Sequence, residues 1–225
     1  MRCSTFRQGM LSVYLLAALI FFGWFPAMAA AQDATAVATP GSSTLQWETC
    51  DDVPDAECAW LDVPLDPAQP DGEQLSLRLA RLPALDPSTS HGSLLLIPGG
   101  PGVGITAAGG QFGVLRPIFH LDELRENFDV VTYDPRGIGQ SHPIRCAALP
   151  VATVASDALS GVMSVAEFEA LATNNAAFAE SCFAATGDLM SHLSAKDSAS
   201  DIEHIRLALG QVDGLVAYSG SYGTL

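Results

Sequence analysis

Short apolar runs and one alternating segment indicate strands in the first half of the chain. Gln74–Leu82 alternates leucine with mostly polar residues, which is typical of a strand with one buried face. Ala59–Val63 precedes it across a Pro-Asp-Gly turn, and we predict that this pair forms an antiparallel edge of the sheet. Leu94–Ile97 and Val130–Tyr133 are continuous apolar runs, which are expected of strands buried on both faces of a mostly parallel sheet.

Helical patterns fill the connections between these strands. Ile105–Asn127 should contain a crossover helix that is interrupted near Pro117. Asp201–Gly210 is predicted as a helix because its isoleucines share one face, with Asp201 in the first turn and the glycine as a C-terminal stop. The turn Gln211–Gly214 then leads to a last strand.

The segment from 147 to 200 is longer than a simple connection requires, and we expect a helical excursion near the functional site. Val165–Phe183 is predicted as a helix because Ser164 and Glu167 form a capping-box pattern. Three acidic residues on this helix are candidates for binding a substrate amine, although a solvated helix face is the simpler interpretation: Glu167, Glu169 and Glu180.

The last residues combine an apolar run with a serine-containing turn. Leu215–Ala217 is interpreted as a buried strand that leads into S-G-S-Y-G-T at Ser219–Thr224. A nucleophile elbow has the pattern G-x-S-x-G, with small residues around the serine because the backbone turns sharply there, and Ser219 departs from it at the first position. We predict that Ser221 is a nucleophile, with an ordinary serine- and glycine-rich turn as the alternative.

A glycine-rich loop follows the apolar run at 94–97. Its sequence P-G-G-P-G suits an oxyanion loop, because glycine lets backbone N–H groups approach a substrate oxygen closely. The prolines have no N–H, so the candidate donors are Gly99, Gly100 and Gly102. The residue after the nucleophile, Tyr222, supplies the second donor in an elbow. A flexible surface turn is the alternative.

A second loop, D-P-R-G-x-G-x-S, follows the run that ends at Tyr133. Its Asp134 and Arg136 are interpreted as a structural salt bridge within the turn, which would hold the loop beside the active site without taking part in chemistry.

With these segments in this order, the chain resembles secreted α/β-hydrolases of the tripeptidyl aminopeptidase type, relatives of the proline iminopeptidases. The resemblance covers Trp47–Leu225, although the iminopeptidases carry histidine where this chain has Pro98. It implies an α/β-hydrolase fold and a serine exopeptidase that releases short peptides from free N-termini. By position, Ser221 matches the nucleophile, and the oxyanion donors match Tyr222 and Gly100, with Gly99 as an alternative.

The family's acid and histidine have no matching positions in this sequence. The α/β-hydrolase order is serine, acid, histidine, whereas all five histidines here precede Ser221. The resemblance therefore implies the N-terminal half of such an enzyme, truncated after the elbow, and we expect residues 1–225 alone to be inactive and poorly soluble. A secreted esterase or lipase of the same fold and a non-catalytic truncated module are the alternatives.

The N-terminus has the layout of a signal peptide over residues 1–31. Arg2 and Arg7 precede the apolar stretch Met10–Phe25, and possible cleavage sites follow Ala29 and Ala31. The apolar stretch is short for a membrane-spanning helix, although an uncleaved anchor is the alternative. Residues 32–45 are expected to form a disordered spacer, and residues 46–225 the N-terminal part of the hydrolase domain.

Removal of that leader leaves four of the five cysteines, and an even number in an exported chain suggests disulfides. Four cysteines allow three pairings; proximity and the family pattern favour Cys50–Cys58 and Cys146–Cys182. A zinc site is the weaker alternative, because no C-x-x-C or H-x-x-x-H spacing is present.

The chain has 25 acidic and 10 basic residues and a net charge of −15. This balance argues against nucleic-acid binding, which needs a basic surface, and suits an exported protein without stable membrane association after signal cleavage. The expected partner is a peptide or small ester substrate, and no metal or organic cofactor is implied.

Overall fold

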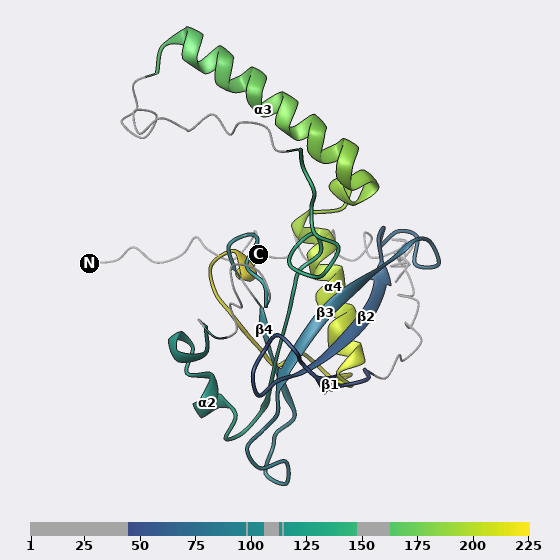
Figure 1. Ribbon diagram of the computed structural model, residues 1–225. Coiled ribbons are helices and arrows are strands. Elements are labelled where there is room, and N and C mark those ends of the chain that lie inside the picture. Colours follow the sequence, from purple (N-terminus) through teal and green to yellow (C-terminus); the bar gives the residue numbers. More distant parts are fainter. Residues whose placement is uncertain (1–44, 98, 106–112, 114, 148–162) are drawn as a thin grey trace, which may run out of the picture. The chain divides into compact units, whose positions relative to one another are not determined.

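The computed structural model describes residues 45–97, 99–105, 113, 115–147 and 163–225, all within one compact unit. Figure 1 shows the sheet that organises them. Six strands lie in the order β1-β2-β3-β5-β4-β6, and their bounds are β1 Glu48–Thr49, β2 Glu57–Pro64, β3 Gln74–Leu82, β4 Ser93–Ile97, β5 Asp129–Tyr133 and β6 Ala217–Ser219. This mixed sheet with flanking helices is compatible with an α/β fold.

The sheet is mixed, and the prediction of a mostly parallel sheet is wrong for the described residues. β1 with β2, β2 with β3 and β3 with β5 are antiparallel, whereas β4 pairs in parallel with β5 and β6. The N-terminal hairpin of β2 and β3 accounts for this difference. Its strand β3 pairs with β5 in the antiparallel direction, so the hairpin joins the same sheet as the parallel strands. The predicted β2–β3 pair is confirmed, but β1 lies outside it as the edge strand.

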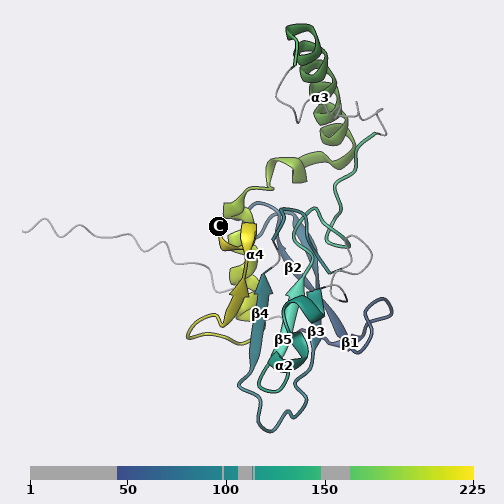
Figure 2. The same cartoon turned by 90° about the vertical axis from the view of Figure 1, so that its left-hand side faces the viewer.

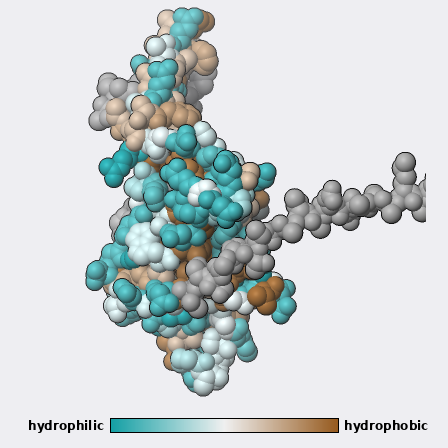
Figure 3. All heavy atoms as spheres, turned by 90° about the vertical axis from the view of Figure 1, so that its right-hand side faces the viewer, coloured by the Kyte–Doolittle hydropathy of each residue, from teal (hydrophilic) through white to brown (hydrophobic). Residues whose placement is uncertain are grey.

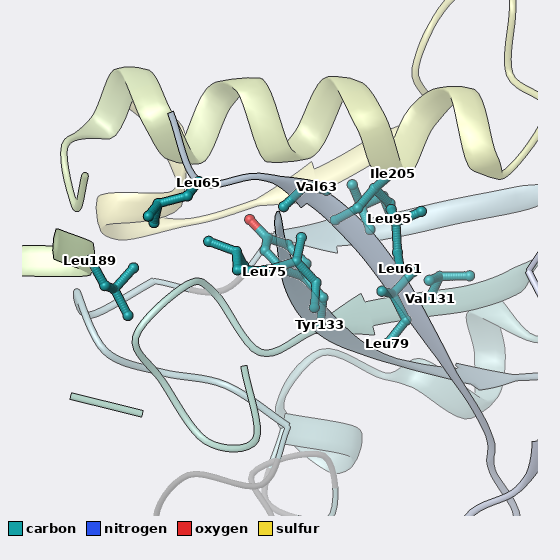
Figure 4. Packing of buried hydrophobic residues seen from close by; sticks show 11 residues of the cluster. Leu61, Val63, Leu65, Leu75, Leu79, Leu95, Val131, Tyr133, Leu189 and Ile205 are labelled. Atoms are coloured by element: carbon teal, nitrogen blue, oxygen red, sulfur yellow. The ribbon is translucent and has the colours of Figure 1, made fainter. Parts of the chain in front are cut away.

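Apolar residues cover both faces of the sheet. Along β4, Leu95 and Leu96 belong to different core clusters, as expected because successive side chains of a strand point to opposite faces. The first cluster includes Leu121 of helix α2 (Leu121–Leu124), and the second includes Ile205 of helix α4 (Ala195–Ala208). Figure 2 shows α4 alongside the strands, and Figure 4 shows the second cluster.

The helix boundaries differ in detail from those expected. The crossover segment is interrupted, as predicted, but at Phe119 and His120, and His120 has a φ of 50°. Helix α4 begins at Ala195, with a capping box between Ser194 and Asp197, and therefore lies partly inside the predicted excursion. Its end before Gly210, which has a φ of 74°, agrees with the predicted glycine stop.

Helix α3 (Val165–Thr186) has the predicted capping box between Ser164 and Glu167 and is followed by the short 3-10 helix η2 (Gly187–Ser191). The three acidic residues considered as amine ligands are exposed, in agreement with a solvated helix face. Several apolar residues are also exposed on α3, which forms the upper part of Figure 3: Val165, Phe168, Phe178 and Phe183.

Both predicted disulfides are present. Cys50–Cys58 closes the loop between β1 and β2, and Cys146–Cys182 ties α3 to the loop after β5. Cys50, Asp52 and Cys58 lie within 4.8 Å of one another, but both thiols are in the disulfide and so are not metal ligands.

The predicted signal peptide and all but the last residue of the predicted spacer lie outside the described residues. Among the helices that are described, none is long and apolar enough to cross a membrane.

Candidate active site

Ser221 occupies the tip of a sharp turn between a strand and a helical turn. β6 ends at Ser219, Gly220 is extended, and the 3-10 helix η3 covers Ser221–Thr224. Ser221 has a φ of 56°. This left-handed region is uncommon for residues other than glycine and is enriched at functional sites. The Thr224 hydroxyl donates to the Ser221 carbonyl at 2.7 Å and so holds the turn.

The strand that leads to this turn differs from the prediction. β6 begins at Ala217, and its residues are exposed rather than buried; Tyr218 is 45% exposed. The reason is its position, because within the described residues β6 pairs with β4 alone and forms the outer strand of the sheet.

The glycine-rich loop lies directly against Ser221. A Cβ on Gly99 would be 3.0 Å from the Gly220 oxygen, 3.2 Å from Ser221 Cβ and 3.7 Å from Ser221 Oγ. This proximity follows from the parallel pairing of β4 and β6, since Ile97 is opposite Ser219 and both strands end at the same edge. The sequence placed these two segments in the same site, and the structure brings them together.

The conformation of Gly100 explains why the second glycine of the loop cannot be replaced by a residue with a side chain. Its φ is 111°, and a Cβ there would lie 2.8 Å from the Gly102 nitrogen, so a side chain does not fit. Among the described residues, no backbone hydrogen bond from the N–H groups of Gly99 and Gly100 is present.

Asp134 is a buried support of this loop. It is 0% exposed, and its Oδ2 accepts a hydrogen bond from the Gln140 N–H at 2.9 Å. A Cβ on Gly104 would lie only 2.3 Å from Asp134 Oδ1, so the carboxylate packs directly against the glycine-rich loop. The sequence interpretation did not identify this contact, although Gly104, the fourth glycine of the segment 99–104, was a signal for it.

Arg136 is structural, as predicted, but its ion-pair partner is not in the turn. Its guanidinium binds the Asp201 carboxylate on α4 at 2.6 and 2.8 Å. The remaining donors bind the main-chain oxygens of Pro64, Leu65 and His192, so all five N–H groups are satisfied. The signal that was missed is Asp201 itself, an acid one turn before Ile205 on the buried face of the helix.

Three of the described histidines contact residues other than Ser221. His120 contacts Glu123 at 3.0 Å, His204 contacts the Ser200 carbonyl at 2.8 Å, and His91 packs against the Phe128 ring. Within the described part of the chain, no histidine forms a hydrogen bond with Ser221.

We expect Gly104→Ala to lower the free energy of unfolding by about 1–3 kcal/mol, the usual range for overpacking a buried site. The new methyl group would collide with Asp134, which is fully buried. Chemical denaturation measures the change. Gly214→Ala is the matched control, because a Cβ there meets nothing within 4 Å; equal stability of the two variants would contradict the proposed packing.

Comparison with known proteins gives no matching family model. The chain is 32% identical over 199 residues to a tripeptidyl aminopeptidase of Streptomyces lividans, covering 85% of this chain and 36% of the relative. It is 34% identical over 182 residues to the serine protease Hip1 of Mycobacterium tuberculosis (75% and 32%). It is 32% identical over 157 residues to a carboxylesterase B of the same species (62% and 29%).

The chain thus spans about a third of the length of these curated relatives. Their names include peptidases and an esterase at nearly the same identity, so the comparison does not separate these subtypes. Together, these similarities support an α/β-hydrolase-like serine hydrolase of the peptidase or esterase type.

Proposed function

We propose that this chain carries the nucleophile and the oxyanion donors of a secreted serine aminopeptidase. The observation that carries the proposal is the left-handed backbone of Ser221 at a strand-to-helix turn, with the glycine-rich loop packed against it. The aminopeptidase assignment is supported by the similarity to the tripeptidyl aminopeptidase of Streptomyces lividans.

The proposed reaction is acyl transfer. Ser221 Oγ attacks the scissile carbonyl while a histidine takes its proton, and the N–H groups of Gly100 and Tyr222 bind the developing oxyanion, with Gly99 as the alternative donor. The histidine then gives the proton to the leaving amine. In the second step the histidine takes a proton from water, the water attacks the acyl-enzyme, and the acyl group leaves Ser221 Oγ, which regains its proton from the histidine. The histidine and its orienting acid would come from outside residues 1–225.

Secretion is part of the proposal. Two disulfides are consistent with an oxidising compartment, and the N-terminal pattern of basic residues, apolar stretch and small residues supports export. The proposed substrate is therefore an extracellular peptide with a free N-terminus.

An esterase is the second candidate, supported by the similarity to a carboxylesterase B. The two candidates share Ser221 and differ in whether the substrate's free amine is required.

The test uses the protein expressed from its complete gene, with peptide anilides that carry free or acetylated N-termini and with short acyl esters. An aminopeptidase is expected to lose at least ~10²-fold in kcat/KM on acetylation, because the groups that bind the ammonium are left without a partner. Equal rates on both anilides, or hydrolysis of esters alone, would contradict the aminopeptidase and support the esterase.

A further inference from the structure

A pocket of about 630 Å³ lies away from the elbow, between the β2–β3 end, the loop 140–145 and residues 185–189. Three buried leucines contribute to its lining: Leu65, Leu75 and Leu189, labelled in Figure 4, come from three separate segments and belong to the second core cluster. Neither Ser221 nor the glycine-rich loop lines it. Its volume lies within the range of pockets that bind small ligands.

The walls of this pocket are tied to one another. The Arg145 N–H donates to Thr186 Oγ1, and the Thr186 hydroxyl donates to the Arg145 carbonyl, each at 2.8 Å. The disulfide Cys146–Cys182 joins the same two segments. On the other side, the Leu65 N–H donates to the Glu73 carbonyl at 2.8 Å. The pocket is therefore held in shape by contacts that do not use the Arg145 side chain.

Arg145 is unusual among the arginines of this acidic chain. Each of the other six arginines in the described residues forms an ion pair, whereas Arg145 forms none there. Glu73 and Asp188 line the same pocket and likewise have no ion-pair partner among the described residues. One cation and two carboxylates, all three exposed, thus line the same pocket without an ion pair among the described residues.

We propose that this pocket binds a short peptide with free ends. The peptide carboxylate would bind the Arg145 guanidinium, the group best suited to carboxylate recognition, and its ammonium group would bind Glu73 or Asp188. A ligand with charges of both signs is favoured because the pocket offers both, and the three buried leucines of the lining would contact its side chains. The inference does not depend on the reactivity of Ser221.

The test is calorimetric titration of trialanine into the Ser221→Ala form of the protein expressed from its complete gene, so that the probe is not consumed. Binding is expected, and Arg145→Gln should weaken it about tenfold or more, as should C-terminal amidation of the probe. In the Arg145→Gln variant, amidation should have little further effect, because the two changes remove the same contact. Glu73→Gln with Asp188→Asn should remove the preference for trialanine over its N-acetyl form.

Lys196→Gln is the matched control, because it removes an exposed positive charge that lies outside the pocket. It should leave trialanine binding unchanged. Absence of trialanine binding, equal affinity in Arg145→Gln, or an equal loss in Lys196→Gln would overturn the proposal. A protein in which Ser221 is unreactive but trialanine binding requires Arg145 would refute the proposed hydrolase and leave the pocket assignment intact.

Discussion

Ser221→Ala is expected to lower kcat by ~10⁴–10⁶-fold in the protein expressed from its complete gene, with little change in stability. Removal of Oγ deletes the attacking atom, whereas the glycine-rich loop and the Tyr222 N–H stay in place to bind substrate. Steady-state kinetics on a free-amine peptide anilide measures the loss. KM should change much less than kcat, because the serine acts in the chemical step.

Ser219→Ala is the matched control for this substitution. It removes a hydroxyl two residues before Ser221, at the exposed end of β6, and alanine is small enough for that position. We expect activity within about threefold of the unchanged protein, since surface substitutions rarely alter the structure. An equal loss in both variants would show that the turn is sensitive to any change and would contradict a specific role for Ser221.

Arg136→Ala is expected to lower the free energy of unfolding by about 3–5 kcal/mol, the usual cost of removing one partner of a buried ion pair. The side chains of Arg136 and Asp201 are each 1% exposed, so the substitution leaves a buried carboxylate and three main-chain oxygens without their donor. Urea denaturation measures the loss, and Arg136→Lys, which keeps the charge but loses the planar fork, should be intermediate.

The loss should also depend on pH. Burial raises the pKa of Asp201 and the Arg136 guanidinium opposes that rise, so the pKa should rise further in Arg136→Ala. A carboxyl whose pKa is raised by folding costs stability once the pH is high enough for the unfolded chain to lose that proton, which begins near the ordinary value of 3.8. The deficit of Arg136→Ala should therefore be smallest at low pH, where Asp201 is protonated in both folded proteins. It should grow as the pH rises from the folded-state pKa of the unchanged protein to the higher folded-state pKa of the variant, and level off above that.

Arg116→Ala provides the comparison for the buried pair. Arg116 binds Asp122 at 2.7 Å, but the Asp122 side chain is 61% exposed. Such surface pairs contribute only ~0–1 kcal/mol. If Arg136→Ala is no more destabilising than Arg116→Ala, the Arg136–Asp201 pair does not hold the loop after β5 to α4.

Much of the fold could be predicted because its elements carry local signals. The alternation in β3, the apolar runs of β4 and β5 and the capping box of α3 each depend on residues close together in the chain. β1 was missed because two residues are too few to form a pattern. The exposure of β6 also could not be predicted, because burial depends on which strands lie beside it rather than on its own sequence.

The site was predictable in its components and not in its contacts. The glycine-rich loop and Ser221 were recognisable as motifs, and parallel pairing of β4 with β6 then brings them together. The Arg136–Asp201 pair joins residues 65 positions apart, and the Gly104–Asp134 contact joins two different loops. Such pairings depend on tertiary packing, which the local sequence does not show. The sequence therefore suggested Asp134, in the same turn, as the partner of Arg136.

The most direct test of the central claim is the site of covalent labelling by a fluorophosphonate. The protein expressed from its complete gene is treated with the probe and digested, and the modified peptide is sequenced by mass spectrometry, with a denatured sample as the control. The account predicts one adduct, on Ser221, that forms much faster in the folded protein and is absent from Ser221→Ala. Labelling of a different serine, or equal labelling of Ser221→Ala, would contradict it.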